Sequence, residues 1–235
     1  MISFVVPAYN EEHELPRTLS AIREAAQDRR FEMIVVDDGS TDATAVVAER
    51  AGARVLSISQ RHIAAARNAG GQAATGDILF FVDADTRITR THVQDAIAAL
   101  ECGFAGGGAR VALEEPIPFW GRVFMRAFSP VYFGLNFGAG AFLFTTRRNF
   151  KDVGGFDEQY FVGEEIYFSV ALRRLGRFKI IREPILTSGR KLRMYSGRRL
   201  LTNSFNILIR GPWGARSRAR RLDLWYEGKR EMPPA

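Results

Sequence analysis

The chain has 235 residues, of which 46% are hydrophobic and 25% charged, and this composition is typical of one α/β domain with a sizeable core. Its single cysteine, Cys102, excludes an intrachain disulfide and favours a reducing compartment. The net charge of +7 is concentrated at one end: residues 187–235 contain 12 Lys and Arg but only 3 Asp and Glu, which predicts an anionic partner near the C-terminus.

No targeting or membrane-spanning segment is expected. Met1 leads directly into an apolar strand without the basic region of a signal peptide. The longest uncharged window, residues 127–146, is interrupted by Pro130, Asn136 and several glycines. We therefore expect a cytoplasmic protein, and its basic C-terminal segment allows a peripheral position on the cytoplasmic face of a membrane.

The first half of the chain predicts successive β–α units. Apolar runs indicate strands over residues 2–6, 31–36 and 78–82, an edge strand over 54–58, and helices over 14–29, 43–51 and 63–74. The strands over 2–6, 31–36 and 78–82 are each followed by polar or acidic residues: Tyr9, Asn10 and Glu11; Asp37 and Asp38; and Asp83 and Asp85. Right-handed crossovers place these ends at one edge of one sheet, where ligands bind in α/β proteins.

The run from Ile78 to Val82 is expected to be the central strand. Five apolar residues without interruption indicate a strand that is buried on both faces. The strand ends on Asp83 and Asp85, whose carboxylates repel each other unless a cation lies between them, so a divalent metal site is one interpretation. An ordinary surface turn, in which Asp is common, is the other.

The nucleotide motifs built on glycine are absent. No Gly-x-Gly-x-x-Gly follows the first strand and no Gly-x-x-x-x-Gly-Lys-Ser/Thr occurs, which disfavours a dinucleotide-binding Rossmann site and a P-loop. The segment Gly106-Gly107-Gly108 is expected to be a turn or a close approach of two backbones.

The second half predicts a less regular arrangement. Helices are expected over residues 91–101, 119–128 and from 164 to a stop at Gly176, with strands over 109–113 and 138–145. Glu164 and Glu165 open the last of these helices, where acidic residues complement the helix dipole.

Seven segments together resemble the family-2 glycosyltransferases of the GT-A fold. They are residues 5–12 (VVPAYNEE), 35–42 (VVDDGSTD), 66–70 (ARNAG), 76–77 (GD), 81–85 (FVDAD), 154–158 (GGFDE) and 163–165 (GEE). A lone Asp-x-Asp is weak, but the ordered set, at the spacings of the family over about three quarters of the chain, is specific.

The resemblance implies an α/β GT-A fold, with a Rossmann-like, mostly parallel sheet and helices on both faces. The catalytic domain is expected over residues 1–190, with a nucleotide-binding half (1–100) and an acceptor-side half (101–190), followed by a basic amphipathic extension (191–235). It also implies an inverting glycosyltransferase that moves a sugar from a UDP-, GDP- or dTDP-sugar to an acceptor hydroxyl.

Carried over residue by residue, the resemblance assigns a donor site. The residues expected to line the nucleoside pocket are Pro7, Tyr9, Glu11 and Asp38, with Arg67 and Gly70 close to the base and ribose. Asp83 is expected near the ribose or the metal, and Asp85 is expected to hold Mg²⁺ or Mn²⁺ against the diphosphate.

Two departures from the family pattern affect these assignments. The family usually has Glu-Asp where this chain has Glu164-Glu165, so Glu165 is expected to be the general base, although its extra methylene could shift the role to Glu164. Some relatives have a late metal-binding histidine, whereas the last histidine here is His92. Arg190 and Lys191 could contact the diphosphate directly instead, or form a solvated basic loop.

Two other functions are weighed against glycosyl transfer. A sugar-phosphate nucleotidylyltransferase has a similar sheet, but it carries a Gly-rich basic loop after the first strand, where this chain has Tyr9-Asn10-Glu11. A nucleic-acid-binding module could use the basic segment with Trp213 and Trp225, but nucleic acid is the less favoured partner.

The C-terminal segment is also a candidate membrane contact. Leu201, Phe205 and Leu208 repeat at helical spacing, and arginines and aromatic residues follow. This composition suits an anionic leaflet and a lipid-linked acceptor. The alternative is that these apolar residues pack on the catalytic domain.

Overall fold

The computed structural model describes residues 1–194, and the expectations for the C-terminal segment lie outside these residues. The strands are β1 (Ile2–Ala8), β2 (Phe31–Asp38), β3 (Arg54–Ile58), β4 (Ile78–Val82), β5 (Thr86–Arg87), β6 (Gly106–Leu113), β7 (Phe142–Thr146) and β8 (Phe178–Thr187). The helices are α1 (Leu15–Ala26), α2 (Thr44–Arg50), α3 (Ile63–Ala73), α4 (Arg90–Glu101), α5 (Phe119–Gly134), α6 (Arg147–Asp152), α7 (Glu164–Leu175) and α8 (Arg190–Met194).

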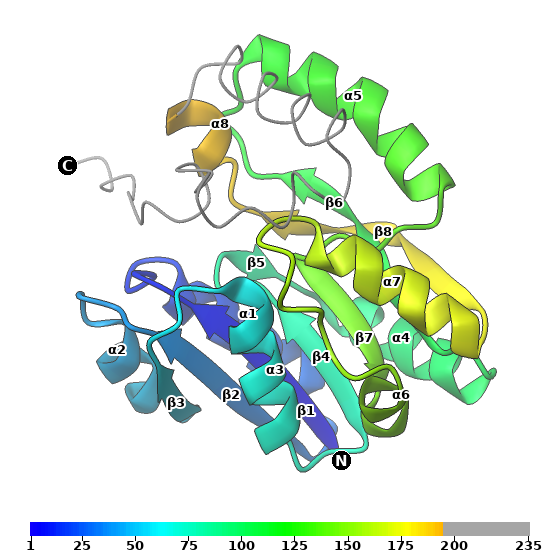
Figure 1. Cartoon of the computed structure of the whole chain (residues 1–235). Coiled ribbons are helices and arrows are strands. Elements are labelled where there is room, and N and C mark those ends of the chain that lie inside the picture. Colours follow the sequence, from blue (N-terminus) through cyan, green and yellow to red (C-terminus); the bar gives the residue numbers. More distant parts are fainter. Residues whose placement is uncertain (195–235) are drawn as a thin grey trace.

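One eight-stranded sheet runs through the described chain in the order β3-β2-β1-β4-β7-β6-β8-β5 (Figure 1). Strands β3, β2, β1 and β4 are parallel neighbours, so the carboxyl ends of β1, β2 and β4 share one edge of the sheet, as expected. This edge, which we call the carboxyl edge, is where the acidic residues of the first half gather.

The sheet is mostly parallel, as expected, and β7 is an antiparallel strand within it. This strand runs antiparallel to both of its neighbours, β4 and β6. Phe142, the first residue of β7, pairs with Val82, the last residue of β4. The chain therefore stays at the carboxyl edge after β6, with α5 there, and does not cross back over the sheet before β7 begins (Figure 1).

Two apolar layers cover the sheet because its strands alternate their side chains. One layer packs Phe4, Phe80 and Phe142 of the sheet against α1, α2 and α4. The other packs Val5 and Phe81 against α3, α6 and α7. Neighbouring residues of β4 thus enter opposite layers, and both are fully buried, which confirms that β4 is a strand buried on both faces.

The three consecutive glycines form the start of β6 and not a turn, so that part of the expectation is wrong. The close backbone approach is confirmed. A Cβ on Gly107 would lie 2.3 Å from the Lys179 carbonyl oxygen and 2.3 Å from Cζ of Phe144. Glycine permits β6 to lie between β7 and β8 while the Phe144 ring crosses its surface.

Two other bounds differ from the sequence prediction. Helix α5 continues to Gly134 with Pro130 inside it, and β7 begins only at Phe142. Within residues 1–194, no helix is both long and apolar enough to cross a bilayer.

We predict that Gly107→Ala lowers the free energy of unfolding by about 1–3 kcal/mol, because the added methyl overlaps a backbone oxygen that cannot move aside. Gly134→Ala is the matched control, since a Cβ there meets nothing within 4 Å in the described chain, and it should change stability by less than about 0.5 kcal/mol. Urea denaturation of both variants measures the difference, and equal stabilities would contradict the packing argument.

Candidate active site

The carboxyl edge brings together side chains from distant parts of the sequence. Arg67 of α3 joins the loop after β4 to the first turn of α7, and Arg190, the first residue of α8, joins the loops after β1 and β4. Two buried arginines, Arg67 and Arg190, organise the carboxylates of this region into two separate ion-pair groups.

Arg67 is the centre of the first group and is only 2% exposed. Its Nη2 donates to Asp83 Oδ1 at 2.9 Å and to the Gly140 carbonyl oxygen at 3.0 Å, and its Nη1 pairs with Glu164. Burial alone would lower the pKa of this guanidinium, but the charges of Asp83 and Glu164 raise its pKa above the ordinary value. Arg67 therefore stays charged and ties α3 to the end of β4 and to the start of α7.

Glu164 and Glu165 have different surroundings although they are adjacent. Gly163, with φ of 79°, turns the chain into α7 and directs Glu164 inward to Arg67. Glu165 is only partly buried, and burial together with the negative charge of Glu164 raises its pKa to about 8. Glu164 is the carboxylate that pairs with Arg67, whereas the raised pKa of Glu165 makes it bind a proton more readily than an ordinary carboxyl group does.

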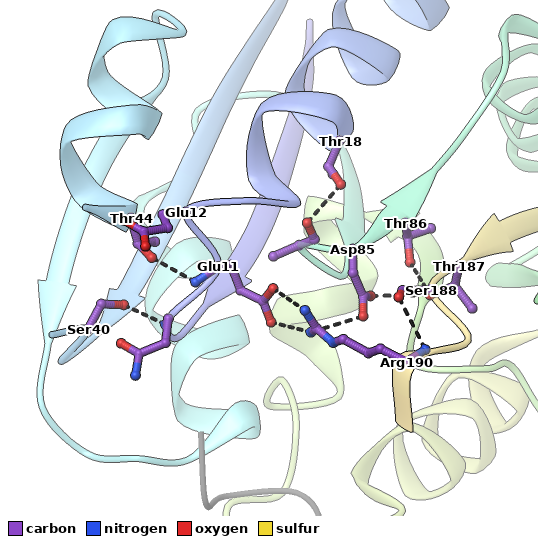
Figure 2. Close-up of polar contacts among 12 residues, drawn as sticks. Glu11, Glu12, Thr18, Ser40, Thr44, Asp85, Thr86, Thr187, Ser188 and Arg190 are labelled. Atoms are coloured by element: carbon purple, nitrogen blue, oxygen red, sulfur yellow. Dashed lines mark hydrogen bonds and ion pairs between the residues drawn. The ribbon is translucent and has the colours of Figure 1, made fainter. Parts of the chain in front are cut away.

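Arg190 is the centre of the second group (Figure 2). Its guanidinium makes a two-pronged pair with Glu11, in which Nη1 lies 2.7 Å from Oε2, and its Nη2 lies 3.1 Å from Asp85 Oδ2. The other oxygen of Asp85 accepts a hydrogen bond from the Thr187 hydroxyl at 3.2 Å. Asp85, from the loop after the central strand, is thus held against the end of β8 and the start of α8.

The described residues contain no group of three His, Cys, Asp or Glu side chains placed to hold a metal ion. Mg²⁺ commonly takes only one or two carboxylates and completes its shell with substrate phosphates and water. Asp85 fits this pattern, because its carboxylate is 14% exposed at the ligand-binding edge of the sheet and already faces a cation. Asp83 fits it less well, because Arg67 takes one of its oxygens.

The residues expected in the nucleoside pocket lie near one another, but their contacts differ. The Asp38 carboxylate accepts three backbone N–H bonds of 2.6–2.8 Å from Gln60, Arg61 and His62, so it fixes the loop before α3. The guanidinium carbon of Arg61 lies 3.3 Å from the ring centroid of Tyr9. This stacked pair lies directly beyond the end of β1, in which Pro7 is buried.

Two expected residues lie elsewhere or are not described in full. Gly70 is in α3 and faces the sheet, where a Cβ would lie 2.3 Å from Cγ1 of Val5. It serves the packing of helix on sheet and is not at the carboxyl edge. Lys191 belongs to α8, and its side chain is outside the described part.

The structure also brings in residues that the sequence prediction did not assign. Tyr132 of α5 donates to the Gly138 carbonyl oxygen at 3.0 Å, and burial and the charges of Glu165 and Glu164 raise its pKa. His62 is 7% exposed, begins α3, and has a pKa lowered by burial. No local sequence motif marks either residue, because contacts between distant parts of the chain create both environments.

Asn68 was part of a recognised segment but had no role assigned to it. Its side-chain amide donates to the Phe156 carbonyl oxygen and to Glu158, both at 2.8 Å, and its oxygen accepts from the Phe156 N–H. It therefore anchors the Gly154–Glu158 turn beside Arg67. Asn68 thus links the recognised segment 66–70 to the recognised segment 154–158.

This arrangement, with helices on both faces of the sheet and paired carboxylates at its carboxyl edge, is the GT-A fold of glycosyltransferases. The chain superimposes over 97% of its length on TarS from S. aureus in complex with UDP, with a TM-score of 0.63, 20% identity and 70% of that chain covered. A mannosyltransferase from Pyrobaculum calidifontis in complex with GDP-Man and Mn²⁺ gives a TM-score of 0.66 at 20% identity, with 90% of this chain and 62% of that chain covered.

Residues 3–182 match the model of the family described as Glycosyl transferase family 2, and the chain belongs to that family. One similar relative is a 4,4'-diaponeurosporenoate glycosyltransferase of Staphylococcus haemolyticus, 36% identical over 103 residues, which are 41% of this chain and 27% of the relative. Another is an undecaprenyl-phosphate 4-deoxy-4-formamido-L-arabinose transferase of Pseudomonas fluorescens, 36% identical over 112 residues, or 44% of this chain and 33% of the relative. The matched segments thus span a third or less of these two relatives. Family membership disfavours the nucleotidylyltransferase alternative.

We predict that Arg67→Met lowers the free energy of unfolding by about 3–5 kcal/mol, because it leaves the buried Glu164 and the partly buried Asp83 without their cation. Arg148→Met, which removes an arginine whose side chain is 89% exposed, is the control and should cost less than about 1 kcal/mol. Urea titration provides the measurement, and a loss below about 1 kcal/mol for Arg67→Met would contradict a central role.

Proposed function

We propose that this chain is an inverting glycosyltransferase that moves a sugar from a nucleotide-sugar donor to an acceptor hydroxyl in one displacement. The observation that carries the proposal is the unequal pair at the start of α7: Glu164 is ion-paired with Arg67, and Glu165 has a pKa of about 8. An inverting displacement needs one base, and a carboxylate with a pKa near the working pH is well suited to that role. Membership of family 2 supports the same reaction class.

Glu165 is the proposed general base, and Glu164 is the proposed positioning residue. Glu165 takes the proton of the acceptor hydroxyl as the oxygen attacks the anomeric carbon. Glu164 cannot serve equally well, because deprotonated Glu164 already neutralises Arg67, and protonating it would leave the guanidinium short of a counter-charge. Its negative charge also keeps the pKa of Glu165 raised.

The donor is proposed to bind along the carboxyl edge. Tyr9, Asp38 and Pro7 are the proposed nucleoside contacts, with Arg61 stacked on Tyr9 as an addition from the structure. For the diphosphate we propose Arg190 and Lys191, and for the ribose Asp83 with Arg67. Glu11 acts through Arg190, with which it pairs, and Gly70 contributes only by letting α3 pack closely on the sheet.

A divalent cation, Mg²⁺ or Mn²⁺, is proposed at Asp85, with Asp83 as a neighbouring acid. Mn²⁺ is present in the P. calidifontis mannosyltransferase and in a glucosyl-3-phosphoglycerate synthase from Mycobacterium tuberculosis, which is similar in fold with a TM-score of 0.60 at 20% identity. When bound, such a cation supplies charge neutralisation for the leaving diphosphate. The choice between the two metals is left to experiment.

For the acceptor we propose a lipid-linked or otherwise apolar molecule. The named relatives from S. haemolyticus and P. fluorescens act, by their names, on diaponeurosporenoate and undecaprenyl phosphate. Both are long apolar chains, which suits an enzyme at the cytoplasmic face of a membrane. The exposed cysteine, Cys102, agrees with a cytoplasmic location.

Asp85→Asn keeps the shape of the side chain and removes its charge, so it should abolish Mn²⁺-dependent nucleotide affinity without changing the fold. Calorimetric titration with UDP and GDP, with and without Mn²⁺, measures this loss. Asp152→Asn on α6, with a side chain 49% exposed, is the matched control and should bind as the unaltered chain does. Full Mn²⁺-stimulated binding by Asp85→Asn would contradict the proposed metal site.

Glu165→Gln should lower kcat by about 10²–10⁴-fold, because it removes the proton acceptor. In the unaltered enzyme the base must be deprotonated, so kcat/KM should rise with pH and level off above about 8. Glu165→Asp, which restores the residue usual in the family, should keep more activity than Glu165→Gln. If Glu164→Gln is inactive while Glu165→Gln is active, the two roles are exchanged.

A further inference from the structure

Arg190 lies at the proposed metal site. Its guanidinium lies against Asp85, the residue proposed to bind a divalent cation (Figure 2). Nη2 is 3.1 Å from Asp85 Oδ2, and a cation on the same oxygen would lie about 2.1 Å from it. Two positive charges cannot share one carboxylate oxygen at these distances without strong repulsion.

The contact between Arg190 and Asp85 is held by several parts of the fold. The Arg190 side chain is only 10% exposed, and it joins the loop after β1, through Glu11, to the loop after β4, through Asp85. The backbone N–H of Glu11 is fixed by Thr44 at 2.8 Å, and Asp85 is fixed by Thr187 and by the Ser188 N–H, each at 3.2 Å. The carboxylate of Asp85 and the backbone of Glu11 are therefore held by groups other than Arg190, whereas the arginine belongs to the short helix α8.

The surrounding carboxylates favour the charged form of Arg190. Its pKa lies above the ordinary value: burial opposes the charge, but the hydrogen bonds that Arg190 donates to Glu11 and the charges of Asp85, Glu11 and Glu14 favour it. Glu14 in turn lies 3.7 Å from Arg87, which also pairs with Glu114. Removing Arg190 from Asp85 would thus leave that carboxylate without its arginine counter-charge.

We propose that Arg190 is an exchangeable counter-ion: it neutralises Asp85 and Glu11 in the ligand-free protein, and binding of a divalent cation with a nucleoside diphosphate displaces it from Asp85 onto the diphosphate. This inference rests on the proposed function. The exchange keeps charges paired at each stage, since Asp85 passes from guanidinium to metal while the guanidinium passes from carboxylate to phosphate. Because Arg190 is the first residue of α8, the exchange also moves the start of α8.

Cation and nucleotide should consequently bind with strong synergy. The cation alone must compete with Arg190 without offering it a new anion, so it binds weakly. A nucleoside diphosphate supplies that anion, so it should raise the affinity for the cation markedly. A role for Arg190 in phosphate binding alone predicts no competition for the cation in the absence of nucleotide.

The test measures Mn²⁺ binding to the full chain from the electron paramagnetic resonance signal of free Mn²⁺. Arg190→Gln, which removes the charge and keeps a polar side chain, should bind Mn²⁺ alone about ten- to a hundredfold more tightly than the unaltered chain. Arg148→Gln removes the same charge at an exposed site on α6 and should leave the affinity unchanged. Asp85→Asn in the Arg190→Gln background should remove the gain.

Addition of UDP or GDP completes the test. The nucleotide that binds should raise Mn²⁺ affinity far more in the unaltered chain than in Arg190→Gln. One outcome overturns the counter-ion exchange and leaves the proposed function standing. In it, the unaltered chain binds Mn²⁺ in the presence of nucleotide, but without nucleotide Arg190→Gln binds Mn²⁺ no more tightly than the unaltered chain. Absence of Mn²⁺ binding to every form, with either nucleotide, overturns the proposed metal site and this inference together.

A second measurement needs no variant. Hydrogen exchange of the amides of residues 190–194 in the unaltered chain should accelerate when saturating Mn²⁺ is added without nucleotide. Unchanged exchange at Mn²⁺ concentrations that saturate the site would overturn the displacement of Arg190.

Discussion

The buried charge of Arg67 is the constraint on which the rest of the site depends. A guanidinium that is 2% exposed must be paired, and its two carboxylate partners, Asp83 and Glu164, come from opposite halves of the chain. The pairing fixes the end of the central strand relative to the start of α7. It also places Glu165 next to Glu164, and burial together with the negative charge of Glu164 raises the pKa of Glu165 to about 8. The ion pair therefore contributes to the proton affinity of the proposed base.

Arg190 imposes a similar constraint on the other side of Asp85, with a different consequence. Arg67 lies within the fold and pairs with the residue that follows β4 and with the first residue of α7, whereas Arg190 begins the five-residue helix α8. The first arginine suits permanent positioning and the second suits exchange. The carboxyl edge thus combines a fixed charge centre with one that ligand charge can replace.

Much of this fold follows from local sequence. The apolar runs of β1, β2 and β4, each ending in acids, predicted the parallel half and its carboxyl edge because burial on both faces requires such runs. The antiparallel β7 was not predicted, since its direction depends on where α5 lies. The role of Gly107 as a strand residue was missed for the same reason: the close neighbours that require glycine belong to β7 and β8.

The candidate site was predictable by residue type but not by partner. Asp85, Glu165 and Arg190 were all expected there, yet neither the Arg190–Asp85 pair nor the burial of Arg67 leaves a local signal. The most direct measurement is a thermal-shift screen of UDP, GDP, dTDP and CDP, each with and without Mn²⁺. The account predicts that at least one nucleotide raises the melting temperature, and does so more with Mn²⁺. No stabilisation by any of the four, or equal stabilisation with and without the metal, would contradict it.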